Sequence, residues 1–170
     1  MTWLFGMQGE DGKRLSRPLL RRAAALAWGW RALPELARSG RGKPYFRHWP
    51  EKWFSLSHSG GLTLCALSDD GPVGVDVEVE RPRRPGLMAY ALSPADQAAC
   101  RGDWGEFSLL WTLKESWCKR EDSPLYPPRE VVTPPPCPHR SYTGPGWRGA
   151  VCCSGIPPED VLWMEPEETP

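Results

Sequence analysis

Residues 73–80 of the chain read Val-Gly-Val-Asp-Val-Glu-Val-Glu, the most regular stretch in the sequence. Valine occupies every odd position, and glycine or an acidic residue occupies every even position. A period of two is typical of a β-strand, in which alternate side chains point to opposite faces. The pattern therefore predicts a strand with one buried, valine-covered face and a second face that carries Asp76 and Glu78.

Two further strands are predicted upstream of this stretch. Residues 53–57 and 62–68 have strand-like composition, and the turn signal Asp-Asp-Gly-Pro follows at 69–72. Between them, Ser-His-Ser-Gly-Gly at 57–61 is small and polar, and we expect a loop rather than a hairpin turn. The strands on either side of the 69–72 turn are predicted to pair with each other as a hairpin.

Helices are predicted on both sides of these strands. Residues 15–38 carry apolar side chains at steps of three and four, which indicates an amphipathic helix. Ser93 and Pro94 have the form of a helix start, and a further helix is expected over about residues 106–120. After these, a final short strand is expected at 149–154.

The composition is that of a globular protein with one domain, 170 residues long and 40% hydrophobic. Lys and Arg together number 21, as do Asp and Glu, so the net charge gives no reason to expect nucleic acid or an anionic membrane as a partner. The first residues lack the pattern of a signal peptide, and no stretch has the ~20 apolar residues of a membrane span. The six cysteines show no zinc-binding spacing, so we expect a cytoplasmic protein with reduced thiols.

Asp76 and Glu78 are the first candidates for chemistry. Because they are two residues apart on a strand, they share a face with Cα atoms ~7 Å apart. Two carboxylates at this spacing repel each other unless a cation lies between them, and hard oxygen ligands suit Mg²⁺. An acidic strand face turned to solvent explains such a pair equally simply, and for an isolated Asp-x-Glu it is the commoner explanation.

Glu115 and Lys119 are the second candidates. They lie one helical turn apart, so they share a face and can form an ordinary surface ion pair. Trp111 and Trp117 flank them on the same predicted helix. For the two residues alone, the surface ion pair is the simpler explanation. The neighbouring tryptophans weaken that explanation, because a helix that carries charges among tryptophans also suits the border of a ligand cleft.

The predicted loop at 57–61 offers hydroxyls, one imidazole and flexible backbone amides, which together suit a phosphate group. Ser57 and His58 also suggest a serine hydrolase, but adjacent residues do not readily form the required nucleophile–base hydrogen bond. The Gly-x-Ser-x-Gly motif is also missing from the sequence. Lys43, between Gly42 and Pro44, is a cation on a stiff loop. By itself it does not indicate a function.

Taken in order, four segments resemble the Sfp-type 4′-phosphopantetheinyl transferases. They are Gly-Lys-Pro at 42–44, Phe-Ser-Leu-Ser-His-Ser at 54–59, Val-Gly-Val-Asp-Val-Glu at 73–78, and Trp-Thr-Leu-Lys-Glu-Ser at 111–116 followed by Lys119. Their order and spacing agree as well as their content. Weaker similarity extends through residues 14–22 and 147–164, so the resemblance covers most of the chain.

The resemblance implies an α+β fold, with two pseudo-symmetric lobes and the active site in the cleft between them. The single domain 1–170 would divide into lobe one at about 1–79 and lobe two at about 80–170. Lobe one would be shortened, because family members usually have a further stretch before the first helix that carries basic coenzyme A contacts. A monomer is expected, with a carrier protein docking near residues 87–92.

The resemblance also implies an enzyme. Such transferases move the phosphopantetheine arm of coenzyme A to a serine of an acyl or peptidyl carrier protein and release 3′,5′-ADP, with Mg²⁺ as cofactor. Carried over to this chain, the metal ligands would be Asp76, Glu78 and Glu115, Lys119 would contact the phosphates, and Glu115 would also be the base for the carrier serine.

The residues implied to bind coenzyme A are Lys43, Ser57 and His58, with Arg14 as a looser match for its 3′-phosphate. Two alternatives to the transferase stay open. One is a catalytically weak paralogue that binds coenzyme A or a carrier protein on the same fold. The other is a phosphodiester hydrolase that uses the same acidic triad, with water in place of the serine.

Overall fold

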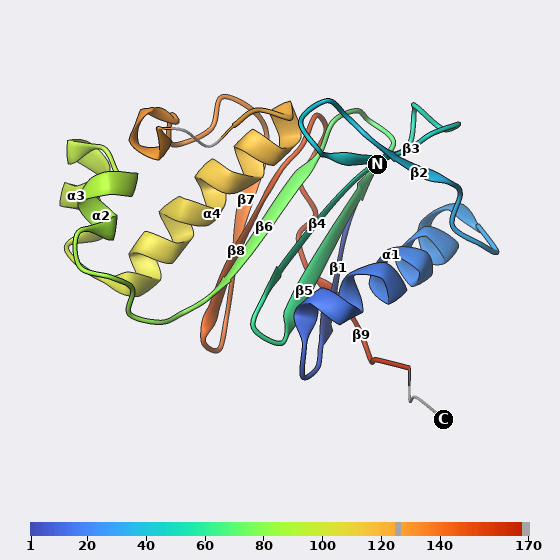
Figure 1. Ribbon diagram of the computed structural model, residues 1–170, viewed down its shortest axis with the longest axis horizontal. Coiled ribbons are helices and arrows are strands. Elements are labelled where there is room, and N and C mark those ends of the chain that lie inside the picture. The colour runs from blue at the N-terminus through green and yellow to red at the C-terminus, as the bar shows by residue number, and fades with distance from the viewer. Residues whose placement is uncertain (125–126, 168–170) are drawn as a thin grey trace.

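A computed structural model of the chain describes residues 1–124 and 127–167. It is a mixed α+β protein of strands and helices (Figure 1). The strands are β1 (Thr2–Gln8), β2 (Leu36–Arg38), β3 (Pro44–Phe46), β4 (Trp53–Ser59), β5 (Leu62–Ser68), β6 (Gly74–Val79), β7 (His139–Gly144), β8 (Trp147–Cys152) and β9 (Leu162–Met164). The helices are α1 (Gly12–Trp28), α2 (Leu87–Ala91), α3 (Pro94–Cys100), α4 (Trp104–Glu121) and a short 3₁₀ turn, Pro128–Glu130.

Two sheets form the centre of the molecule. The first has the strand order β4-β5-β1-β9, with β9 parallel to β1 and the other neighbours antiparallel. The second has the order β6-β8-β7 and is antiparallel throughout. β2 and β3 form a separate two-stranded ribbon. The predicted hairpin between residues 62–68 and 73–79 is wrong, because β1 and β4 already occupy both edges of β5.

The sheets are packed in layers with one long helix on each outer side. Apolar side chains from β1, β5, β6 and β8, among them Leu4, Leu64 and Val75, make the core between the two sheets. On the other face of the first sheet, Phe5 and Cys65 pack against Leu19 of α1. α4 covers the outer face of the second sheet (Figure 1). The buried valine face predicted for β6 is therefore confirmed.

Gly74 explains how α4 can lie so close to β6. A Cβ atom built on Gly74 would collide with the carbonyl oxygen of Ser116 and the backbone nitrogen of Arg120, both on α4. Across the same interface, the Ser116 hydroxyl lies 3.2 Å from the Cys152 thiol of β8. The even-numbered face of β6 is therefore turned to α4, and the two acidic side chains on it lie beneath a helix instead of facing open solvent.

The first helix is shorter than the sequence predicted. α1 begins after Asp11, whose carboxylate accepts a hydrogen bond from the Lys13 backbone N–H at 2.9 Å, and it ends at Trp28. The predicted helix continued to residue 38. Gly29 ends it earlier, because its φ of 69° is the left-handed conformation typical of a residue that follows a helix.

The strand–loop boundary at residues 57–61 also differs from the prediction. β4 continues through Ser59, and Gly60 and Gly61 alone connect it to β5. Gly60 has a φ of 57°, which is easily adopted by glycine and allows so tight a turn. Ser57 and His58 are consequently strand residues with opposite orientations.

Elsewhere the predictions for the second half of the chain are largely confirmed. The Ser93 hydroxyl accepts a hydrogen bond from the Asp96 backbone N–H, and Pro94 is the first residue of α3. α4 covers the helix predicted at 106–120, and β8 overlaps the strand predicted at 149–154, but that strand is not the last, because β9 follows it. Within the described residues, no helix is both long and apolar enough to cross a membrane.

Candidate active site

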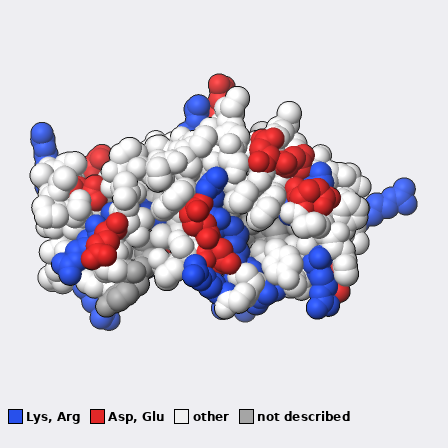
Figure 2. Space-filling model, turned by 90° about the horizontal axis from the view of Figure 1, so that it is seen from above, with Lys and Arg blue, Asp and Glu red and all other residues white. Residues whose placement is uncertain are grey.

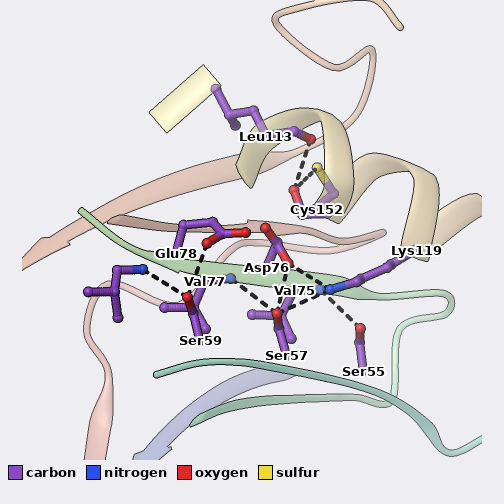
Figure 3. Close-up of polar contacts among 12 residues, drawn as sticks. Ser55, Ser57, Ser59, Val75, Asp76, Val77, Glu78, Leu113, Lys119 and Cys152 are labelled. Carbon is purple, nitrogen blue, oxygen red and sulfur yellow. Dashed lines mark hydrogen bonds and ion pairs between the residues drawn. The ribbon is translucent and has the colours of Figure 1, made fainter. Parts of the chain in front are cut away.

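Asp76 lies near the middle of β6, under α4, and its residue surface is only 4% exposed. One carboxylate oxygen, Oδ1, accepts hydrogen bonds from the Ser57 hydroxyl at 2.7 Å and from the Lys119 ammonium at 2.6 Å. Lys119 also lies 3.1 Å from the Ser57 Oγ, so the three polar groups touch one another (Figure 3). The sequence-predicted Asp76 and Lys119 are thus brought into direct contact.

The second oxygen of Asp76 has a different environment. Oδ2 is buried and has no hydrogen-bond partner among the residues that the structure describes. Burial raises the pKa of the Asp76 carboxyl, although the Lys119 ammonium acts in the opposite direction. An unpaired buried carboxylate oxygen is costly, and such atoms commonly mark a functional site.

Glu78 follows on the same face of β6, with its side chain 20% exposed. Its Oε2 accepts a hydrogen bond from the Ser59 hydroxyl at 3.0 Å and forms an ion pair with Arg83 at 2.5 Å. Neither Ser59 nor Arg83 was among the predicted site residues. The signal for Ser59 was present in the sequence, since a serine stands at every second position from 55 to 59.

Glu115 faces this pair from α4. Burial raises the pKa of Glu115 to about 7, and the negative charge of Asp76 adds to the increase, while Lys119 lowers it. The negative charge of Glu78 also raises the pKa of Glu115. A carboxyl group with a pKa near neutrality can accept or release a proton under physiological conditions.

A pocket of about 610 Å³ opens beside Glu115 and Lys119. Its walls are the loop between β2 and β3, the middle of β4 and the C-terminal end of α4. Arg41 and Lys43 add basic side chains to the lining, while Phe54 and Leu56 add apolar ones. Figure 2, seen from this end of the molecule, shows basic and acidic side chains gathered at the centre of the face. Such a mixture of cations and apolar surface suits a ligand with both phosphate and ring or alkyl parts.

Lys43 lines the pocket and also connects two segments of the fold. Its ammonium donates to the backbone carbonyls of Lys119 at 2.5 Å, Val73 at 3.2 Å and Arg120 at 3.4 Å. These contacts attach the β2–β3 loop to the end of α4, where the helix presents its unpaired carbonyl groups. Burial is the main cause that lowers the pKa of Lys43 to about 8.

Three of the residues predicted to contact coenzyme A lie in unexpected settings. The Ser57 hydroxyl has one hydrogen to donate and two lone pairs, and Asp76, Lys119 and the Val77 N–H at 3.3 Å already use all three. His58 is exposed on the other face of β4. Arg14 is exposed in the first turn of α1, near Asp11, and neither it nor His58 lines the pocket. Their predicted ligand contacts stay predictions.

The carboxylates do not form a ready-made metal cage. Within residues 1–124 and 127–167, no group of three or more His, Cys, Asp or Glu side chains is arranged to hold a metal ion. The charges of Asp76 and Glu78 both raise the pKa of Glu115, but Lys119 pairs with Asp76 and Arg83 pairs with Glu78. The predicted triad is therefore an acidic cluster that is partly neutralised by cations of the protein itself.

The fold and site together define a mixed α+β protein with a largely buried acidic cluster, one member of which, Glu115, lines a pocket that also carries Arg41, Lys43 and Lys119. Residues 72–141, which include β6 and α4, match the family model of the 4′-phosphopantetheinyl transferase superfamily. The resemblance to this superfamily that the sequence predicted is thus confirmed over these residues.

Curated relatives agree with this assignment. The chain is 38% identical over 95 residues to 4′-phosphopantetheinyl transferase AcpT of Salmonella typhi, which covers 52% of the chain and 50% of the relative. It is 32% identical over 119 residues to a 4′-phosphopantetheinyl transferase of Bacillus subtilis, with 65% and 53% covered. Identity to Sfp of Bacillus subtilis strain 168 is 29% over 150 residues, with 75% and 66% covered. The chain thus spans about half the length of the first two of these relatives.

Proposed function

We propose that the chain transfers the 4′-phosphopantetheine arm of coenzyme A to a serine of an acyl or peptidyl carrier protein. The observation that carries this proposal is the position of Glu115, whose carboxyl group titrates near neutrality between the acidic strand β6 and the basic pocket. The names of the relatives supply the reaction class. In this reaction the serine oxygen attacks the β-phosphorus, the pyrophosphate bridge breaks, and 3′,5′-ADP leaves.

Coenzyme A would lie in the pocket with its phosphates toward the cations. Lys119 borders both the pocket and Asp76, so its ammonium can contact a phosphate oxygen while it stays near the acidic cluster. Arg41 provides a second charge in the lining, with its guanidinium donating to the Asp122 carbonyl at the end of α4 at 2.8 Å. Phe54 and Leu56 offer apolar surface for the adenine ring.

Mg²⁺ is the proposed cofactor, and the donor set fits it. Mg²⁺ is usually held by one or two carboxylates together with substrate phosphates, so a complete protein cage is not required. The buried Oδ2 of Asp76, without a partner among the described residues, is a free hard oxygen ligand, and the charges of Asp76 and Glu78 both act on Glu115 nearby. When bound, the ion would neutralise charge on the diphosphate.

Glu115 is the proposed base. Its pKa of about 7 leaves a large fraction of the side chain deprotonated in the cell, and it remains basic enough to take the proton of the carrier serine. Lys119 would hold negative charge on the 5′-phosphate of the leaving 3′,5′-ADP. Because Lys119 already pairs with Asp76, its position is fixed before a ligand arrives, which lowers the cost of reorganisation.

The two sheets are proposed to be the cores of the two lobes, with the active site at their junction. The sheets do not divide at residue 79 as the predicted lobes did, because β6 pairs with β8 in the second sheet and β9 pairs with β1 in the first. The carrier is proposed to dock over α2, where Tyr90 is 50% exposed beside the partly buried Leu87 and Met88. A monomeric state and a cytoplasmic location are further predictions of the same proposal.

The proposal is tested by incubating the protein with Mg²⁺, coenzyme A and a panel of apo carrier proteins, followed by intact mass spectrometry of the carriers. We expect one phosphopantetheine to be added to at least one carrier and the addition to be lost with Glu115→Gln. Glu106→Gln, the same change at an exposed position of α4, is the matched control and should retain transfer.

Other outcomes favour the two alternatives. Coenzyme A binding without any mass gain across the panel would contradict the transferase and favour a weak binding paralogue. Release of phosphopantetheine from a holo carrier would favour the phosphodiester hydrolase.

A further inference from the structure

Three serines of β4 connect the two sheets through their side chains. The hydroxyls of Ser55, Ser57 and Ser59 accept hydrogen bonds from three backbone N–H groups of β6. The donors are Val75 at 3.1 Å, Val77 at 3.3 Å and Val79 at 3.1 Å (Figure 3). β4 and β6 belong to different sheets and do not pair through their backbones. The serine oxygens therefore take the place of the carbonyl oxygens that a neighbouring strand would supply.

Two of these serines make a second contact that the third does not. Ser57 donates its hydroxyl hydrogen to Asp76 at 2.7 Å, and Ser59 donates to Glu78 at 3.0 Å. Each donates to the residue just before the valine from which it accepts. For Ser55 the equivalent position is Gly74, which has no side chain to accept a bond. We call these three serine contacts the serine ladder. Two of the three serines, Ser57 and Ser59, also bind a carboxylate, and Ser55 does not.

This arrangement restricts the carboxylates as well as joining the sheets. The bond from the valine N–H fixes the position of each serine oxygen on a rigid strand. The hydroxyl hydrogen is then directed at a carboxylate on the neighbouring strand, and bonds to charged acceptors are stronger than neutral ones. At Ser57 every donor and acceptor is used within the protein, so its hydroxyl is committed to Asp76.

We propose that Ser57 and Ser59 are positioning residues for the acidic cluster. Ser57 holds Asp76 with Oδ1 toward Lys119 and Oδ2 free, and Ser59 holds Glu78 against Arg83. The importance of this for transfer rests on the proposed function. The positioning itself is a property of the protein alone and is measured without any substrate.

The first test is a comparison of Ser57→Ala with Ser55→Ala, which lose the same kind of inter-sheet hydrogen bond. High-resolution crystal structures should show the Asp76 carboxylate rotated or spread over several orientations in Ser57→Ala and unchanged in Ser55→Ala. Ser57→Thr, which keeps the hydroxyl, should restore the original orientation. An unmoved Asp76 carboxylate in Ser57→Ala would overturn the proposal, whether or not the wild type transfers phosphopantetheine.

A double-mutant cycle provides a second test in solution. We expect Ser57→Ala and Asp76→Ala to be coupled by roughly 10-fold or more in the equilibrium constant of unfolding, since the pair shares a hydrogen bond to a charged group. Ser55→Ala and Asp76→Ala should be coupled by less than about 2-fold, as independent sites are. Equal coupling in the two cycles would mean that the serines only join the sheets, and would refute the positioning role.

If the wild type proves to be a transferase, steady-state kinetics will measure how the loss of Ser57 affects transfer. Loss of a residue that orients a metal ligand typically costs about 10- to 100-fold in activity or in metal affinity. Ser57→Ala should lower kcat by that factor with little change in KM for coenzyme A, and should weaken Mn²⁺ binding in electron paramagnetic resonance titrations. A rise in KM at constant kcat would instead support a direct contact between Ser57 and coenzyme A, and would contradict the proposal.

Discussion

Glu115→Gln is expected to stabilise the protein at alkaline pH while it removes transfer activity. The folded protein raises the pKa of Glu115 from 4.5 to about 7. A difference of about 2.5 pKa units corresponds to about 3.4 kcal/mol. Because the side chain is partly exposed, solvent screening reduces this to about 2 kcal/mol. The amide has the shape of the carboxyl group and carries no charge, so the variant avoids this cost of folding.

The sign of the effect follows from proton linkage. Below the unfolded pKa, Glu115 is protonated in both states and does not affect stability. As the pH rises toward 7, the unfolded chain releases its proton first, so the folded state loses stability relative to the unfolded state until its own pKa is passed. The gain from Glu115→Gln should therefore be near zero at about pH 4 and complete at about pH 8.

Urea denaturation at both pH values, with a chelator present to exclude bound metal, measures this difference. Glu106→Gln is the control, because Glu106 is exposed in the first turn of α4 and its negative charge favours the helix. That variant should lose about 0.5 kcal/mol at about pH 8, the opposite sign. The burial argument is refuted if Glu115→Gln is no more stable than wild type at this pH, or if its gain is the same at both.

Three further predictions concern α4 and its neighbours. Gly74→Ala should destabilise the fold by about 2–3 kcal/mol in urea denaturation, because its Cβ collides with backbone atoms of α4. Lys114→Met should cost about 3 kcal/mol, because the fully buried ammonium lies 3.2 Å from Asp96 and its loss leaves that carboxylate unpaired. Adding Asp96→Asn should recover part of the loss, and no recovery would contradict the ion-pair explanation. In initial-rate measurements, kcat should rise with pH and level off above about 7 as Glu115 loses its proton, and a rate that is flat through this range would exclude Glu115 as the base.

The regular strand β6 was predictable because its alternation reflects two different environments. The valine face proved to be buried between the sheets, as expected. Alternation does not reveal what covers the second face, however. Asp76 was expected at a solvent-facing or cleft-facing surface, yet it lies under α4 and is almost fully buried, because Gly74 lets the helix approach.

The pairing of the strands was less predictable. The short turn at 69–72 favoured a hairpin of β5 and β6, since neighbours in sequence often pair. β1 takes that edge of β5 instead, with Thr2 opposite Ser68 and Gln8 opposite Leu62. The aromatic and aliphatic stretch of β1 carried a strand signal, but no local rule indicates that it pairs with residues some sixty positions later.

For the site, the resemblance identified more than the residue patterns did. Its order of motifs led to Asp76, Glu115 and Lys119, which the structure gathers at the junction of the sheets. The serine ladder was overlooked because residues 57–61 were expected to form a loop, where a period of two has no meaning. Once Ser57 and Ser59 are strand residues, their spacing predicts that both lie on the same face, and the structure shows that this face meets β6.

The pairing of β9 with β1 has a consequence for how the protein is made. Phe5 and Leu162 are neighbours in this sheet, and Trp163 covers the backbone at Gly6. On the ribosome, β1, α1, β4 and β5 emerge long before β9, so one edge of β1 stays unpaired during most of translation. Contacts between distant parts of a chain form slowly, and an open strand edge invites association with other chains. The nascent protein should therefore depend on chaperones, or on rapid completion of synthesis, until residues 162–164 close the sheet.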